Sequence, residues 1–330
     1  MGKSNMKSGR LMNRSSILGW IVCLICLYAF PFGISAQDEQ PAKARRDRNS
    51  GVVNPSREMQ LLLRYMPVSA LSVPDSFKGM QENRIEDPYA SLDRFWEMLG
   101  KMERPVRIVH IGDSHVRGHL FPYVMRKQLE HDFGGEAVLD MEVSYRTSGL
   151  AHETGRAGVV YHILGVNGAT CATFATDERI RMITDLKPDL VIVSFGTNEA
   201  HARRYSPSEH RWQMQLLVDR IRNHCPDVAF LITTPPGAYV RNGRSGRVIN
   251  PRTPRVVETE RLFAEENHLA LWDMYDIVGG KPRACLNWLA AKMYQRDRIH
   301  FNVEGYTLQG LLLHQAFIKA YNDYVATKLD

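Results

Sequence analysis

The chain has 330 residues, of which 44% are hydrophobic and 24% charged, with 24 glycines and 16 prolines. This composition is ordinary for a globular protein and excludes collagen, coiled coil and extended disorder, and the mean hydropathy of -0.30 excludes a polytopic membrane protein. The net charge is +6, but four basic residues and no acid lie in residues 1–36, so the rest of the chain has 38 basic and 36 acidic residues. This nearly neutral body predicts no nucleic-acid partner.

The first 36 residues have the three zones of a secretory signal. A basic stretch is followed by the uncharged run 17–30 and by Ile34-Ser35-Ala36 before polar residues. We expect cleavage near Ala36 and a secreted or periplasmic protein of the cell envelope. The alternative is an uncleaved N-terminal anchor, because residues 17–36 carry no charge and are just long enough to span a bilayer, although Pro31 and Gly33 interrupt them. The sequence predicts membrane contact only through this segment.

The region after the signal predicts a polar leader or linker over residues 37–85, followed by a single domain over residues 86–330. Residues 37–60 combine basic residues with Pro, Asn, Ser and Gly and show no apolar periodicity. Three cysteines remain beyond the signal, and an odd number so widely spaced is not a disulfide framework. The three cysteines are Cys171, Cys225 and Cys285. They can form at most one disulfide bridge, and the pattern leaves open whether any of them pair.

Apolar periodicity in the domain predicts alternating helices and strands. Helices are expected over 92–99, 120–129, 177–186, 208–224, 254–267 and 303–325, and strands over 106–111, 158–164, 189–195, 228–233 and 269–272. Strands separated by helices imply right-handed crossovers, so the fold class is α/β, a doubly wound parallel sheet with helices on both faces.

Polar residues follow three of the predicted strands directly, and a fourth polar cluster precedes the last helix. The carboxyl ends of parallel strands lie at one edge of a sheet, where open α/β sheets place their sites. The sequence therefore predicts one site built from four segments: Gly112-Asp113-Ser114-His115, Asn167-Gly168-Ala169-Thr170, Gly196-Thr197-Asn198-Glu199 and Asp297-Arg298-Ile299-His300.

These segments supply the groups that acyl transfer to a serine needs. A serine hydroxyl is a weak nucleophile without a base, and we assign these two roles to Ser114 and His300. Asp297, three residues earlier, would orient the imidazole and stabilise its protonated form. The tetrahedral intermediate needs hydrogen-bond donors, for which we assign the backbone N–H groups of Ser114 and Gly168 and the side-chain amide of Asn198.

The four segments in this order resemble the SGNH (GDSL-type) hydrolases, from about Val106 to the C-terminus. His115 after the serine and Glu199 after Asn198 are similar to the peptidoglycan O-acetylesterase and related carbohydrate-esterase branch. The resemblance implies a three-layer sandwich and a carboxylic ester hydrolase that removes O-acetyl groups from a glycan without cofactor or metal. It implies supporting roles for Asp113, His115 and Glu199, with His115 as a wall of the serine site or a hydrogen-bonding support.

Other functions stay open at this stage. An O-acetyltransferase of the same superfamily would use the same residues, as would a lipase or lysophospholipase, and a non-catalytic glycan-binding protein would also fit an exported chain. Gly-Asp-x-His after a strand is also the first segment of the metallophosphoesterase pattern. The G-D-x-x-D and G-N-H segments that supply the other metal ligands of that pattern are absent from the sequence. Arg241, Arg244 and Arg247 lie in a polar segment that either binds an anionic glycan or is a solvated loop.

Overall fold

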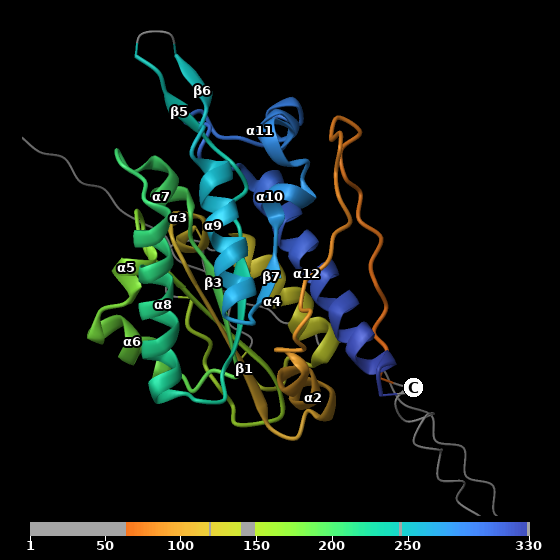
Figure 1. Cartoon of the computed structure of the whole chain (residues 1–330). Coiled ribbons are helices and arrows are strands. Elements are labelled where there is room, and N and C mark those ends of the chain that lie inside the picture. The colour runs from red at the N-terminus through yellow and green to blue at the C-terminus, as the bar shows by residue number, and fades with distance from the viewer. Residues whose placement is uncertain (1–63, 119, 140–148, 244–245, 329–330) are drawn as a thin grey trace, which may run out of the picture. The chain divides into compact units, whose positions relative to one another are not determined.

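A parallel sheet of five strands lies at the centre of the structure, in the order β2-β1-β3-β4-β7 (Figure 1). Ile108 of β1 lies opposite Tyr161 of β2 on one side and Leu190 of β3 on the other. The predicted α/β fold with a doubly wound parallel sheet is confirmed. The five strands are β1 (Pro105–Gly112), β2 (Gly158–Gly165), β3 (Leu190–Ser194), β4 (Ala229–Thr233) and β7 (Ala270–Trp272).

The computed structural model describes residues 64–118, 120–139, 149–243 and 246–328. The predicted signal segment, residues 37–63 of the predicted leader and Arg244 lie outside the described residues. Within these ranges, no helix combines the length and apolar character that crossing a membrane would require.

Both faces of the sheet are buried, which explains why its strands read as continuous apolar runs. Because successive strand residues point to opposite faces, Ile108 and Ile192 enter one core while Val109 and Val191 enter another. Most strand positions on both faces are therefore apolar, and His110 of β1 is a buried exception whose two ring nitrogens contact Tyr161 and Ser194.

Helices cover the sheet on both sides (Figure 1). One face is covered by α2 (Asp93–Lys101), α4 (Leu120–Phe133) and α12 (Val303–Ala326). There Trp96 of α2 contacts Phe317 of α12 edge to face, with ring centroids 4.6 Å apart. The other core is covered by α5 (Cys171–Phe174), α6 (Asp177–Thr184), α8 (Pro207–His224) and α9 (Thr253–Glu266). The remaining helices of the described chain are α3 (Ser114–Arg117), α7 (Thr197–His201), α10 (Met274–Ile277) and α11 (Gly280–Ala290).

Residues 64–85 differ from the predicted linker, because they pack against the domain. Phe77 and Ile85 are each only 8% exposed and belong to the main core. The side-chain nitrogen of Asn83 donates to the carbonyl of Leu312 at 2.8 Å, and its oxygen accepts the indole N–H of Trp272 at 3.0 Å. The sequence predicts a domain that starts at residue 86, whereas the described residues from 64 onward pack on it. Isolated apolar residues without helical or strand spacing carry no periodic signal, which explains the difference.

The polar segment after β4 is a β-hairpin rather than an irregular loop. Strands β5 (Tyr239–Arg241) and β6 (Arg247–Ile249) pair antiparallel and extend beyond the neighbouring helices (Figure 1). Strands of three residues are too short to show an alternating pattern, which is why the sequence did not predict them.

Candidate active site

The strand order reverses direction at β1, and the predicted site residues lie at this point. The chain passes from β1 to β2 on one side and then to β3 on the other, which creates a crevice beyond the carboxyl ends of the strands. Ser114 begins α3 immediately after β1, Gly168 follows β2, and Asn198 lies in α7 after β3. The topology therefore brings three of the four predicted segments to one edge of the sheet.

Two glycines allow the serine helix to lie directly against the strands. A side chain at Gly112 would collide with Val116 and with the carbonyl of Ser194, and one at Gly165 would collide with the backbone of Arg117. With these positions open, α3 follows β1 without an intervening loop.

Ser114, His300 and Asp297 form a continuous hydrogen-bonded chain. The imidazole Nε2 of His300 lies 2.8 Å from Ser114 Oγ, and its Nδ1 lies 2.6 Å from Asp297 Oδ2. The other oxygen, Asp297 Oδ1, accepts the backbone N–H groups of Ile299 at 2.9 Å and of His300 at 3.0 Å. Because an ionised carboxylate only accepts, Nδ1 carries a proton and Nε2 is the atom able to take the serine proton.

The electrostatics of Asp297 suit this arrangement. Partial burial raises its pKa, but the hydrogen bonds from the His300 ring and from the backbone N–H groups of Ile299 and His300 outweigh burial, so the pKa is lowered overall. The carboxylate is ionised at neutral pH and can stabilise a protonated imidazole.

Asn198 joins two of the predicted segments. Its amide nitrogen donates to the carbonyl of Ala169 at 2.9 Å and more weakly to Asp113 Oδ2 at 3.3 Å. Within the described part of the chain, the backbone N–H groups of Ser114 and Gly168 make no hydrogen bond. Gly168 has a φ of +73° and open space where a Cβ would stand. Two backbone donors are thus unengaged, whereas the Asn198 amide also holds the loops together.

The buried carboxyl groups of Asp113 and Glu199 hold the same loops in place by accepting backbone N–H groups. Asp113 Oδ1 accepts the backbone N–H of His115 at 2.8 Å, which caps α3. Glu199 accepts the backbone N–H groups of Cys171 at 3.0 Å and Gly196 at 2.9 Å. Burial raises the pKa of Glu199 and raises that of Asp113 to about 8. Asp113 is therefore largely protonated at neutral pH and adds little negative charge beside the serine.

His115 lies beside the base rather than in the hydrogen-bonded chain. Its ring centroid is 5.3 Å from that of His300, and its Nδ1 lies 3.1 Å from the hydroxyl of Tyr306. Burial lowers the pKa of His115 to about 3, with a smaller effect of the neighbouring His300. A neutral imidazole can pack against His300 without repelling the charge that His300 gains on protonation.

A polar cavity of about 320 Å³ opens directly onto the serine and the imidazole. Its lining contains Asn167 of a predicted segment, together with one cationic, one amide and one phenolic side chain that the sequence does not single out. Of these, Arg117 lies one helical turn after the serine and Gln295 two residues before Asp297, so closeness along the chain was the available signal. The lining residues are Ser114, Arg117, Gly118, Asn167, Gln295, His300 and Tyr306.

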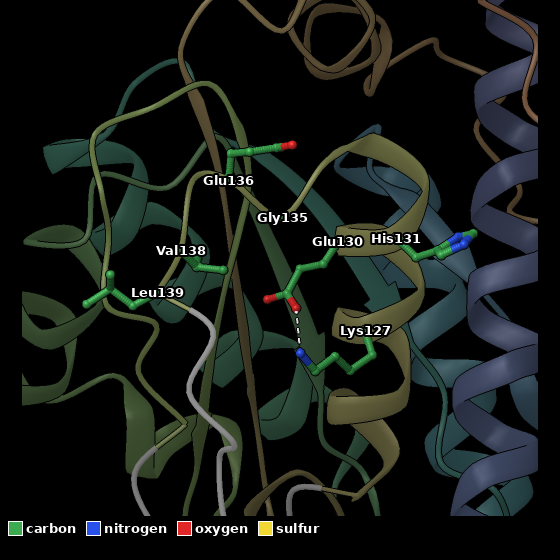
Figure 2. Close-up of a pocket in the computed structure, with 7 residues that line it drawn as sticks. All are labelled: Lys127, Glu130, His131, Gly135, Glu136, Val138 and Leu139. Atoms are coloured by element: carbon green, nitrogen blue, oxygen red, sulfur yellow. Dashed lines mark ion pairs between the residues drawn. The ribbon is translucent and has the colours of Figure 1, made fainter. Parts of the chain in front are cut away.

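A larger cavity, of about 450 Å³, lies elsewhere (Figure 2). It is lined by residues at the end of α4 and in the loop before β2, and therefore lies near the amino end of that strand. Its Lys127 and Glu130 form an ion pair at 3.2 Å. No serine or cysteine is among its seven lining residues, so it offers no nucleophile for acyl transfer.

One buried group among the described residues has metal-ligating side chains. One ligand atom each from Cys171, Glu199 and His210 lies within 4.8 Å of the others. Both oxygens of Glu199 already accept backbone N–H groups, so support of the loops accounts for its position. Each cysteine in the described ranges has a free thiol: Cys171, Cys225 and Cys285.

The model of the GDSL-like lipase/acylhydrolase family matches residues 111–308. The chain belongs to this family. The match begins at the end of β1 and includes every segment of the predicted site. Membership in the GDSL-like family confirms the prediction of a carboxylic ester hydrolase. A search of curated protein sequences returns no match.

Solved structures of esterases and acylhydrolases are similar to this chain at low sequence identity. A peptidoglycan O-acetylesterase is 17% identical with a TM-score of 0.60, covering 74% of this chain and 99% of that chain. A lipase/acylhydrolase from Enterococcus faecalis is 19% identical with a TM-score of 0.46, covering 65% of this chain and 96% of that one. An acetyl-xylooligosaccharide esterase from Geobacillus is 16% identical with a TM-score of 0.42, covering 66% and 94%. At 17% identity, the likeness to the peptidoglycan O-acetylesterase concerns the fold.

Proposed function

We propose that this protein is a serine esterase that removes acetyl groups from an O-acetylated glycan, with peptidoglycan as the first candidate. The observation that carries the proposal is the hydrogen-bonded chain from Ser114 through His300 to Asp297, with distances of 2.8 Å and 2.6 Å. Such a chain lets a neutral serine become a nucleophile because the base already contacts its hydroxyl.

The reaction follows from the atoms that face one another. Ser114 Oγ attacks the ester carbonyl while His300 Nε2 takes the serine proton, and the proton then passes to the departing sugar oxygen as the C–O bond breaks. This leaves an acetyl group on Ser114. Water attacks the acetyl carbonyl with His300 as base, and acetate leaves as the serine is restored. The unengaged backbone N–H groups of Ser114 and Gly168 stabilise the oxyanion in both steps. The amide of Asn198 joins them by exchanging its weaker bond, the 3.3 Å contact with Asp113, for the oxyanion.

The nature of the cavity supports a small acyl group on a hydrophilic carrier. A long acyl chain requires a continuous apolar groove, whereas Arg117, Asn167 and Gln295 surround the serine here. This polarity disfavours the lipase alternative. The fold likeness to a peptidoglycan O-acetylesterase is the reason to test peptidoglycan first.

Secretion to the cell envelope is part of the proposal and rests on the signal-like residues 1–36. An O-acetylated glycan of the envelope would be available to the protein in that compartment.

Acetate release from O-acetylated peptidoglycan, acetylated xylan and p-nitrophenyl acetate tests the proposal. We expect Ser114→Ala to lower kcat by about 10³ or more. The exposed Ser208→Ala should retain the wild-type rate. An active Ser114→Ala enzyme, or wild type that resists serine-directed phosphonates, would contradict the mechanism. Transfer of acetyl to added glycan in excess of hydrolysis would identify an acetyltransferase instead.

A further inference from the structure

The β5–β6 hairpin begins at the loop that carries Asp297 and His300. The backbone N–H of Tyr239, the first residue of β5, donates to the carbonyl of Arg298 at 2.9 Å. Arg298 has a φ of +54°, a left-handed conformation that is uncommon for a side chain of this size. From this point the hairpin extends outward (Figure 1). Its base is thus fixed to the segment that holds the imidazole.

Two arginines share one face of this hairpin, and a third lies at its base. Residues two apart on a strand point to the same side, as do residues directly opposite on paired strands. Tyr239 and Arg241 therefore share a face, and Arg247, directly opposite Arg241, shares it too. The guanidinium of Arg298 lies 5.3 Å from the centroid of the Tyr239 ring, which adds a third cation at the base. The face carries a row of positive charge that starts beside the triad loop.

Among the described residues, no carboxylate pairs with this row of arginines. Across the described residues, no carboxylate lies within ion-pair distance of Arg241, Arg247 or Arg298, although other surface arginines have such partners. Like charges directly opposite on paired strands are unfavourable, so the Arg241–Arg247 pair costs stability in the free protein. A bound anion would relieve that repulsion.

We infer that Arg298, Arg241 and Arg247 bind the carboxylates of an anionic glycan strand whose ester enters the cavity at Ser114. A guanidinium presents two parallel N–H groups to a carboxylate, which suits a repeating uronate or carboxylated amino sugar. The row begins at Arg298, two residues before His300, whose imidazole contacts Ser114. This inference rests on the proposed esterase function and names the class of its substrate.

Binding of labelled oligogalacturonate to the full chain tests this inference without any ester being cleaved, so its result does not depend on the esterase proposal. We expect Arg241→Gln with Arg247→Gln to raise Kd about tenfold or more, because two charge-assisted contacts are lost. The matched control is Arg84→Gln with Arg181→Gln, which removes the same charge from exposed sites elsewhere. Circular dichroism and the Tm of each variant verify folding.

Three further results decide the assignment. We expect the control Kd to stay within about twofold of wild type, methyl-esterified oligogalacturonate to bind poorly, and added salt to weaken binding. Equal loss in both double variants would overturn the inference, because it would show general attraction of charge. Unchanged binding in the hairpin variant, or full binding of the methyl ester, would overturn it as well. Tighter binding of polyphosphate without binding of oligogalacturonate would replace the carboxylate with a phosphate ligand.

Discussion

Asp297→Asn offers a sharp test of the proposed triad, because the structure dictates how the new amide must point. The two backbone N–H groups of Ile299 and His300 both donate to Asp297 Oδ1. In the variant, this position must be the carbonyl oxygen, because an NH₂ group there would face two donors. The NH₂ group therefore takes the position of Oδ2, which lies 2.6 Å from His300 Nδ1.

An amide donor at this position reverses the protonation of the imidazole. Nδ1 must accept the amide N–H, so the neutral ring carries its proton on Nε2, the atom that lies 2.8 Å from Ser114 Oγ. A protonated Nε2 cannot take the serine proton. We expect kcat to fall by about 10⁴, or about 5.5 kcal/mol of activation free energy, as for the same change in a serine-protease triad.

The assay is the initial rate of p-nitrophenyl acetate hydrolysis at saturating substrate, with KM measured alongside. Asp177→Asn is a matched control, since its carboxylate pairs with Arg220 on the surface and its side chain is 80% exposed. The control should retain the wild-type kcat. An Asp297→Asn enzyme within tenfold of wild type would refute the tautomer argument and leave Asp297 as a structural support of its loop.

Two further predictions concern the groups beside the triad. Asn198→Ala removes the amide that contacts Ala169 and Asp113, and kcat should fall by about 10²–10³ with little change in KM; a normal kcat would show that the residue only shapes its loop. The pKa of buried Asp113 is about 8, above its ordinary 3.8, so the folded protein keeps a proton that the unfolded chain has released. The free energy of unfolding should therefore fall as pH rises, by about 1.5–2 kcal/mol from this group between pH 6.5 and 8. Urea unfolding should show a shallower fall in Asp113→Asn, and an unchanged slope would exclude Asp113 as its source.

The arrangement of the sheet and the position of the site could be predicted because both have local signals. Strands buried on two faces read as apolar runs, and small polar residues at their ends have no place in a core. Ser114 and Asn198 were recognisable for this reason, and Asp297 from its spacing of three residues to His300. The contact between Asn198 and Asp113 was not, since two polar residues 85 positions apart carry no mutual signal in one sequence.

Features that depend on packing or on backbone conformation could not be predicted from the sequence. Two backbone hydrogen bonds hold the left-handed φ of Arg298 against the preference of the residue itself. Its N–H donates to the carbonyl of Gln295 within the same turn, and its carbonyl accepts the N–H of the distant Tyr239. Likewise, Asn83 places residues of the predicted linker on the domain through side-chain amide contacts. Neither the conformational propensity of a residue nor the hydrophobic periodicity of the sequence predicts either arrangement.

The position of Ser114 relative to the strands depends on two glycines, which have no side chain. Gly112 and Gly165 leave room for α3 to rest on the strands, so a single methyl group at either position would lift the helix and carry Ser114 with it. The contact with His300 tolerates little such movement, because it is already only 2.8 Å long. Inactivating substitutions in this enzyme therefore need not touch any group that takes part in the reaction. A mutational survey would find such substitutions at Gly112 and Gly165, where the absence of a side chain allows α3 to pack on the strands.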